Sequence, residues 1–293
     1  MSEGDERTFF KLLQEQLNDI VRLFNIRFNI LKDVKAKQAP ILYMSGAIAR
    51  LQANETIERL LYQDWSSVSI GYVGLHNCLK ALYGEGLENQ NKDIIKKGAN
   101  IMQYMKNFCD MMKATTNIGY SLYGTPAETL ATKFCEEDIK EFGIIKGVND
   151  NGYYENSFHY PSNMLISPFE KLDTEESLSR ISTGGCINFI ELGDMRDNLE
   201  AMETIIRYAY DKAHFLGISS ISDKCLECGY DGEIFTKQNS DFEFQCPNCK
   251  NDNPMTLSII RKLCGYCGSI FERPTASGKM REIKNRRNHK GCN

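Results

Sequence analysis

Apolar residues recur at helical spacing along much of the chain. Between residues 8 and 31 one stripe is formed by Phe9, Leu13, Leu17, Ile20, Phe24, Phe28 and Leu31. Such a stripe predicts an amphipathic helix that buries one face. By the same criterion we expect helices over residues 56–62, 75–83, 91–115 and 198–212.

Short β-rich or apolar runs lie between these helices. Residues 41–44, 67–73, 118–122, 186–192 and 215–221 are expected to form strands. The tetrapeptide Thr125-Pro126-Ala127-Glu128 has the order of a capping box and predicts the start of a further helix. Strands that alternate with helices favour an α/β architecture with largely parallel strands.

Charge and hydropathy exclude some classes of function. The formal charge of -4 is not that of a nucleic-acid binder, which usually carries a basic excess. No apolar run is long enough to span a membrane, so no membrane association is expected. The first six residues are acidic and lack the features of a signal peptide. The sequence therefore predicts a cytoplasmic protein that binds neither membrane nor nucleic acid.

The 11 cysteines are many for a protein of a reducing compartment, and six of them form three Cys-x-x-Cys pairs near the C-terminus. Two pairs supply the thiolates of Cys225, Cys228, Cys246 and Cys249. Four sulfur ligands at such spacing predict a closed, structural zinc site. Two alternatives remain open, namely four free buried thiols, or a site in which Cys246 and Cys249 pair with Cys264 and Cys267.

The third pair lies in Lys262-Leu263-Cys264-Gly265-Tyr266-Cys267-Gly268. This stretch resembles the glycyl radical signature, with Lys262 and Leu263 in place of an arginine and a β-branched residue. Further resemblance lies upstream, at residues 39–42, 69–75, 125–128, 152–159 and 183–185. Together and in this order they are similar to class III anaerobic ribonucleoside-triphosphate reductases, over essentially the whole chain but only the C-terminal half of the family's protein.

The resemblance implies a fold and three segments. Residues 1–220 would form a partial α/β barrel, about half of the ten-stranded barrel of glycyl radical enzymes. Residues 221–253 would form the zinc knuckle, and residues 254–293 the glycyl radical loop and a basic tail. Half a barrel leaves open sheet edges and apolar surface, so a complementary chain is expected.

The resemblance also implies a function. Gly265 would store a radical installed by an activating enzyme that uses an iron–sulfur cluster and S-adenosylmethionine. In the family, the radical passes to a cysteine, whose thiyl abstracts the 3′-hydrogen of a ribonucleoside triphosphate, and the active enzyme is expected to be a homodimer. That cysteine lies upstream of the part matched here, so an N-terminal reductase fragment is the expected partner. The alternatives are a non-catalytic α/β protein with a zinc-ribbon binding module and an inactive relative of the reductase.

Four residues are candidates for substrate contact. Asn156, Ser157 and His159 lie in one matched stretch, and Thr125 would place a helix N-terminus near a substrate phosphate. Each has a simpler explanation, because His159 suits a polar loop and Thr125 suits a helix cap. The basic residues between Lys279 and Lys290 are expected to form a solvated surface rather than a nucleic-acid arm.

Overall fold

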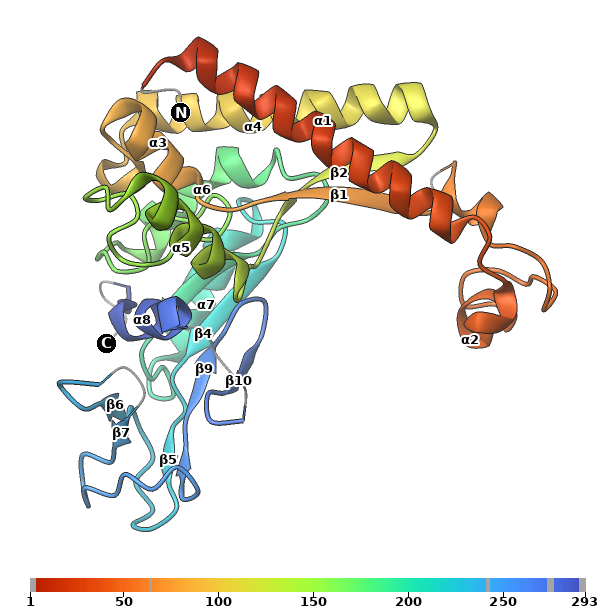
Figure 1. Ribbon diagram of the computed structural model, residues 1–293. Coiled ribbons are helices and arrows are strands. Elements are labelled where there is room, and N and C mark those ends of the chain that lie inside the picture. The colour runs from red at the N-terminus through yellow and green to blue at the C-terminus, as the bar shows by residue number, and fades with distance from the viewer. Residues whose placement is uncertain (1–3, 64, 241–242, 273–276, 290–293) are drawn as a thin grey trace. The chain divides into compact units, whose positions relative to one another are not determined.

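The computed structural model describes residues 4–63, 65–240, 243–272 and 277–289. The chain forms two compact units (Figure 1). The first comprises residues 1–70, 101–123 and 182–184, and the second comprises residues 71–100, 124–181 and 185–293. Residues 1–3 of the acidic N-terminus, and Lys290 and Cys292 of the C-terminal tail, lie outside the described residues.

The first unit is built around helix α1 (Glu6–Leu31), the C-terminal part of α4 (Lys92–Thr116) and the paired strands β1 (Ser67–Tyr72) and β2 (Gly119–Gly124). Asp5 caps α1 by accepting a hydrogen bond from the backbone of Thr8 at 2.9 Å. The two helices contact through the rings of Phe10 and Tyr104, whose centroids lie 4.9 Å apart. The expected helices at 8–31 and 91–115 and strands at 67–73 and 118–122 are confirmed.

The expected strand at residues 41–44 is wrong. Residues 41–43 lie in the short helix α2 (Pro40–Tyr43), which follows the 3-10 turn η1 (Ala36–Gln38), and Met44 is the C-cap of α2. Pro40 occupies the first helical turn, where its missing N–H is not needed. The Ile41 side chain is 75% exposed. A short apolar run therefore does not show by itself whether it is buried. The helix expected at 56–62 is reduced to the 3-10 turn η2 (Glu58–Leu61).

The second unit begins with α3 (Leu75–Tyr83), the 3-10 turn η3 (Leu87–Asn89) and the start of α4. It continues with α5 (Leu130–Phe142) and α6 (Pro168–Ser179). The capping box expected at residues 125–128 is wrong, because α5 starts only at Leu130 and Thr125 lies in the preceding loop. A capping box does form at α6, where Ser167 and Glu170 bond each other's backbone N–H groups.

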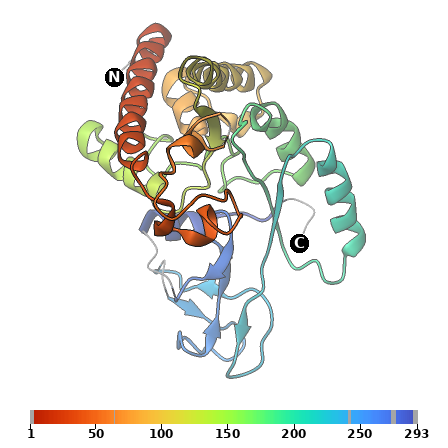
Figure 2. The same ribbon diagram turned by 90° about the vertical axis from the view of Figure 1, so that its right-hand side faces the viewer.

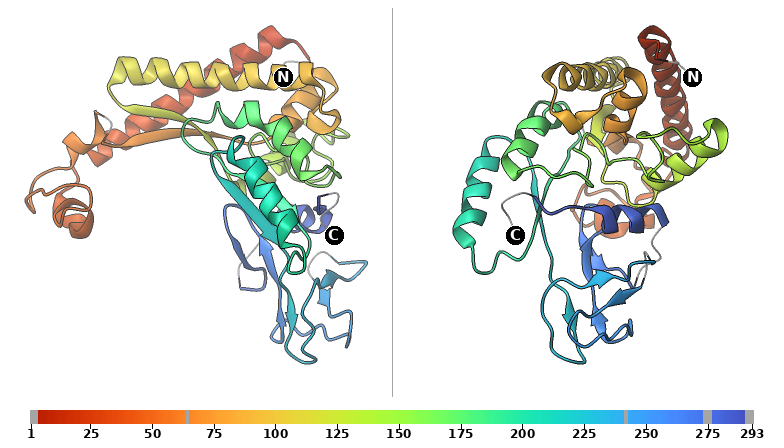
Figure 3. Two further views of the ribbon diagram at one scale, coloured as in Figure 1. Left: turned by 180° about the vertical axis from the view of Figure 1, so that it is seen from behind. Right: turned by 90° about the vertical axis from the view of Figure 1, so that its left-hand side faces the viewer.

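Strands β3 (Asn188–Leu192) and β4 (Leu216–Ser220) form a parallel pair, and α7 (Leu199–Tyr210) connects them. Figure 3 shows α7 alongside this pair. The buried side chains between the helices and strands are Leu172, Ile190, Leu192, Met195, Ile205 and Ala209. This element is the parallel α/β unit that the sequence predicts, and it confirms the expected elements at 186–192, 198–212 and 215–221.

The C-terminal part consists of short antiparallel pairs rather than parallel strands. Its elements are β5 (Lys224–Cys225), β6 (Phe235–Thr236), β7 (Phe244–Gln245), β8 (Leu257–Ser258), β9 (Ile260–Lys262), β10 (Cys267–Ser269) and α8 (Ser277–Asn285). This part of the chain has the blue colours in Figure 2. They share one apolar core that includes Cys225, Cys246, Leu263, Ile270 and Met280. In the described part of the chain, no helix has both the length and the apolar character to cross a membrane.

Candidate functional site

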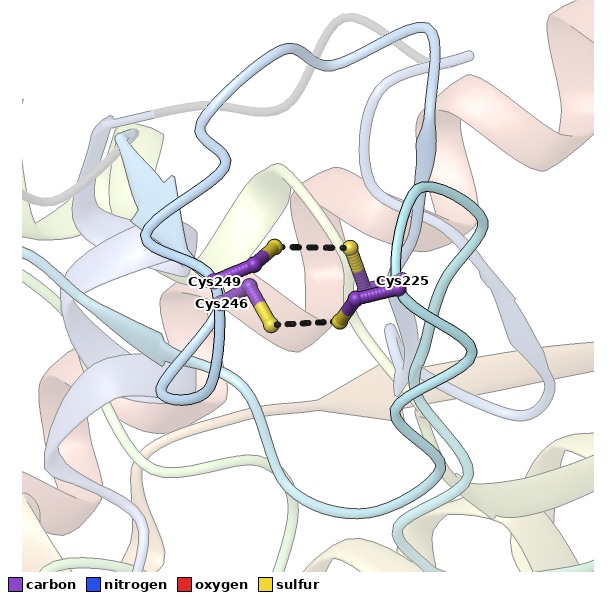
Figure 4. A group of neighbouring side chains, drawn as sticks. Cys225, Cys246 and Cys249 are labelled. Atoms are coloured by element: carbon purple, nitrogen blue, oxygen red, sulfur yellow. Dashed lines mark hydrogen bonds between the residues drawn. The ribbon is translucent and has the colours of Figure 1, made fainter.

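Four cysteines converge in the second unit. The sulfurs of Cys225, Cys228, Cys246 and Cys249 all lie within 4.8 Å of one another. Figure 4 shows the side chains of Cys225, Cys246 and Cys249 pointing toward one another. The Cys225 and Cys249 sulfurs are 3.6 Å apart, and those of Cys228 and Cys246 are 3.7 Å apart. Four sulfurs about 2.3 Å from a zinc ion at tetrahedral angles would lie about 3.8 Å from one another. The cluster is therefore compatible with zinc.

Two similar turns hold these sulfurs. The N–H of Gly229 bonds the carbonyl of Cys225 at 2.9 Å, and the N–H of Lys250 bonds that of Cys246 at 3.1 Å. The residue after each Cys-x-x-Cys pair has a left-handed backbone, with φ of 75° at Gly229 and 63° at Lys250. Asn251 donates its amide to the Cys225 sulfur, and this bond lowers the pKa of Cys225 to about 6.

The two turns allow a paired test. Gly229→Ala adds a side chain where there is open space but the backbone is left-handed, so we expect a loss of about 1 kcal/mol in stability. Lys250→Gly removes the same strain and should not destabilise the module. Chemical denaturation of both zinc-loaded variants measures the difference. If the two substitutions changed the stability by the same amount, the left-handed backbone at Lys250 would not be strained.

Cys264 and Cys267 do not belong to the cluster. Cys264 instead directs its thiol at the Glu128 carboxylate, with the sulfur 3.8 Å from Oε2, and Cys267 is exposed. The arrangement favours the four cysteines of the first two knuckles over the alternative site that uses the third pair.

The third cysteine pair flanks the tip of a β-hairpin. Strands β9 and β10 pair with Lys262 opposite Cys267, and the N–H of Leu263 bonds the carbonyl of Tyr266 at 2.9 Å. Gly265 lies exposed at this tip. A Cβ atom at Gly265 would lie 3.5 Å from Pro126 and 3.7 Å from Ile187, which are ordinary contacts, and its φ is outside the left-handed region. Neither space nor backbone geometry requires a glycine here.

The base of the hairpin is fixed by charge. Lys262 forms a buried ion pair with Glu191 of β3, and its ammonium lies 4.2 Å from the centroid of the Phe189 ring. Arg286 donates to the Lys262 carbonyl at 3.0 Å. Burial lowers the pKa of Lys262 to about 8, against the attraction of Glu191. Burial also opposes ionisation of Glu191, but Lys262 and Arg286 outweigh it and hold the pKa of this carboxyl well below its usual range.

Helix α8 extends this charged network. Glu282 pairs with Arg286 at 2.8 Å and with Lys279 at 2.6 Å. Glu155 is buried nearby and accepts bonds from the backbone and hydroxyl of Ser162. Burial, followed by the charge of Glu282, raises the pKa of Glu155 to about 7.

The raised pKa of Glu155 predicts a pH dependence of stability. Between pH 4.5, its ordinary pKa, and about 7, the folded state keeps a proton that the unfolded state has lost. Stability therefore falls as pH rises through this window and the loss is complete above it. We expect Glu155→Gln to stabilise the chain at pH 8 by about 1–3 kcal/mol, with a much smaller gain at pH 5. Denaturation at both pH values measures this, with exposed Glu141→Gln as the control, and an equal gain at both would contradict it.

The structure brings some of the candidate substrate residues together with the hairpin. Asn156 and His159 line one cavity of about 50 Å³ that is also lined by Glu128, Lys262 and Cys264. This volume holds a few water molecules. Thr125 and Ser157 are not among the residues that line it.

Two of these candidates have structural partners. Asn156 accepts a bond from the backbone N–H of Ala127 at 3.1 Å and so fixes the loop before α5. The His159 ring contacts the rings of Phe158 and Phe189, and its Nδ1 lies 3.4 Å from Glu175 Oε1. Burial lowers the pKa of His159. Their roles toward a substrate stay predictions.

Sequence reasoning missed the charged partners of the hairpin. It assigns Glu128 to a helix cap, and it does not single out Glu191 and Arg286. The side chains of Glu128 and Tyr266 meet across 138 positions of sequence, at 3.0 Å. No local pattern signals such a contact. The sequence clue to these partners is Lys262, a charged residue at the start of the motif.

Comparisons with known proteins identify the family of the chain. The model of the family described as anaerobic ribonucleoside-triphosphate reductase matches residues 1–289. The reductase of Escherichia coli K12 is 38% identical over 291 residues, which are 99% of this chain and 40% of that protein. The reductase of Enterobacteria phage T4 is 36% identical over 289 residues, 98% of this chain and 46% of that protein.

The fold is also that of solved reductases. One anaerobic ribonucleotide reductase has a TM-score of 0.66 and 16% identity, covering 92% of this chain and 38% of that one. The Thermotoga maritima enzyme with glycerol in its active site has a TM-score of 0.65 and 15% identity. The match covers 98% of this chain and 42% of that enzyme. The chain thus spans less than half the length of these relatives. It belongs to the anaerobic ribonucleoside-triphosphate reductase family.

Proposed function

We propose that this chain supplies the C-terminal catalytic portion of an anaerobic ribonucleoside-triphosphate reductase. Gly265 stores a radical on its Cα atom, and Cys225, Cys228, Cys246 and Cys249 hold a structural zinc ion. In this proposal residues 1–220 form part of the barrel, residues 221–253 the zinc module, and residues 254–293 the radical loop and tail. Family membership over residues 1–289 supports the assignment.

The observation that carries the proposal is the absence of a structural need for glycine at position 265. Gly71, by contrast, has Thr125 Oγ1 2.1 Å from the position of a Cβ, so packing explains it. At Gly265 the nearest contact would be 3.5 Å away, and the backbone is one that other residues adopt. A chemical requirement explains glycine better, because only glycine leaves the Cα atom free of a side chain.

The chemistry proceeds by hydrogen-atom transfers. The partner enzyme, with its iron–sulfur cluster and S-adenosylmethionine, removes one hydrogen atom from the Gly265 Cα. The amide nitrogen and the carbonyl on either side delocalise the unpaired electron. Gly265 then regains a hydrogen from a cysteine thiol, and the resulting thiyl abstracts the 3′-hydrogen of the ribonucleoside triphosphate. The 2′-hydroxyl leaves as water, and an external reductant supplies two electrons, which are taken up with two protons. The cysteine then returns the hydrogen to C3′, which gives the deoxynucleotide and regenerates the thiyl.

The cysteine for this step is proposed to come from the part of the relatives' length that this chain does not span. An N-terminal reductase segment is therefore one proposed partner, beside the activating enzyme and a second copy of the assembled reductase. The zinc ion would hold the two knuckles together, and so support the apolar core that the hairpin shares. The alternative of a zinc-ribbon binding module needs Cys264 and Cys267 as ligands, and the position of the Cys264 thiol at Glu128 disfavours it.

Oxygen provides the test. After anaerobic assembly with the N-terminal segment and the activating enzyme, the chain should give a doublet electron paramagnetic resonance signal, because one hydrogen remains on the Gly265 Cα. Exposure to air should then cleave the backbone at Gly265. The proposal is wrong if the activated assembly shows no doublet and mass spectrometry finds the chain intact after exposure to air.

A further inference from the structure

One carboxylate oxygen contacts both neighbours of Gly265. Oε2 of Glu128 accepts the hydroxyl of Tyr266 at 3.0 Å and lies 3.8 Å from the sulfur of Cys264. Cys264 and Tyr266 immediately precede and follow Gly265. The two residues that flank Gly265 are therefore both held by the same carboxylate oxygen.

The segment that carries Glu128 is itself fixed. The N–H of Ala127 bonds the carbonyl of Thr125 at 3.0 Å and the side chain of Asn156 at 3.1 Å. Pro126, one residue further back, provides the nearest atom to the Cβ position of Gly265, at 3.5 Å. The loop before α5 thus presents a rigid ring and a carboxylate to the tip of the hairpin.

The base of the hairpin does not depend on Glu128. Leu263 is fully buried in the core shared with the zinc module, and Lys262 is paired with Glu191. The base would therefore remain in place if the contacts to Glu128 were lost, whereas the exposed tip would lose both side-chain bonds to that carboxylate. The effect of such a loss should be local to residues 264–266.

We propose that Glu128 is the positioning residue of Gly265. It clamps the hairpin tip through Tyr266 and Cys264 and so sets the place of the Gly265 Cα atom. The assignment of Gly265 as the atom to be positioned rests on the proposed function, whereas the clamp itself is a property of the chain before activation. Hydrogen bonds to a carboxylate are strong and directional, which suits this role.

The clamp is tested first without any radical. The zinc-loaded chain is alkylated with a thiol reagent, and the modification rate of Cys264 is measured against that of exposed Cys267 in the same peptide. Tyr266→Phe removes the hydroxyl without touching the Glu128 charge, so a change in rate reports the position of the loop. We expect the Cys264/Cys267 rate ratio to rise about tenfold, as the loss of one bond to a carboxylate would allow.

Tyr154→Phe is the matched control. It removes a similar bond, from the Tyr154 hydroxyl to Asp138 at 2.7 Å, which does not involve the hairpin. This variant should keep the wild-type ratio. An unchanged ratio in Tyr266→Phe, or an equal rise in Tyr154→Phe, would overturn the clamp.

The second measurement separates positioning from general stability. In the activated assembly, Tyr266→Phe and Glu128→Ala should keep radical content per chain within about twofold of wild type and lose about tenfold in turnover per radical. Glu128→Gln retains an acceptor oxygen and should recover part of this turnover. If the radical content and the zinc content of these variants fell together with the turnover, Glu128 would have only a structural role. That result would overturn the proposal. If wild-type protein acquires no radical, the proposed function fails, while the alkylation result still decides whether the clamp exists.

Discussion

Replacing Gly265 with alanine is expected to abolish the radical signal and the turnover of the assembled enzyme while leaving the fold intact. The added Cβ would contact Pro126 at 3.5 Å and Ile187 at 3.7 Å, so the melting temperature should change little. The methyl group, however, blocks access to the Cα atom and crowds the planar radical. Electron paramagnetic resonance of the activated assembly and thermal denaturation of the isolated chain measure the two effects.

Gly268→Ala is the matched control for this experiment. It adds the same methyl group to the same hairpin, with the nearest contact at 3.4 Å, and leaves Gly265 in place. This variant should keep the doublet and the oxygen-dependent cleavage. A doublet that survives in Gly265→Ala would place the radical on another residue.

Removing the metal is expected to have the largest effect on structure. Cys225 and Cys246 are almost completely buried and share a core with Leu263 of the hairpin and Met280 of α8. Metal binding to four thiolates contributes on the order of 10 kcal/mol in small zinc modules. Chelation or Cys246→Ser should therefore release about one zinc per chain, increase proteolysis between residues 224 and 271, and reduce the radical yield to background.

Metal content distinguishes the two possible ligand sets. Cys267→Ser alters an exposed residue outside the cluster and should retain one zinc per chain. If this variant loses zinc as completely as Cys246→Ser does, the third cysteine pair provides ligands and our assignment of the four is wrong.

Local pattern predicted the long helices and the four-cysteine cluster well. The apolar stripes at residues 8–31 and 91–115 correspond to α1 and α4, because a helix of this length must bury one face. The four clustered cysteines were identified from spacing, since two Cys-x-x-Cys turns present sulfurs in the same way wherever they occur. In these cases the determining interactions lie within a few residues.

The local sequence pattern was misleading in short segments, where one pattern is compatible with several structures. The order Thr-Pro-Ala-Glu fits a capping box, but Asn156 holds Ala127 in a loop and Glu128 bonds Tyr266 instead. The apolar run at residues 41–44 fits a buried strand, but the helix α2 leaves Ile41 exposed. Short segments carry too little information to choose between these outcomes, and contacts from elsewhere decide.

The sequence by itself determined which residues are candidates for the chemistry. The four cysteines follow from spacing, and Gly265 follows from its motif, because both depend on residues that are neighbours in the chain. Only the tertiary structure decided which residues contact the hairpin that carries Gly265. The partners Glu128 with Tyr266 and Glu191 with Lys262 are 138 and 71 positions apart, so they meet only after the hairpin packs against the loop before α5 and against β3.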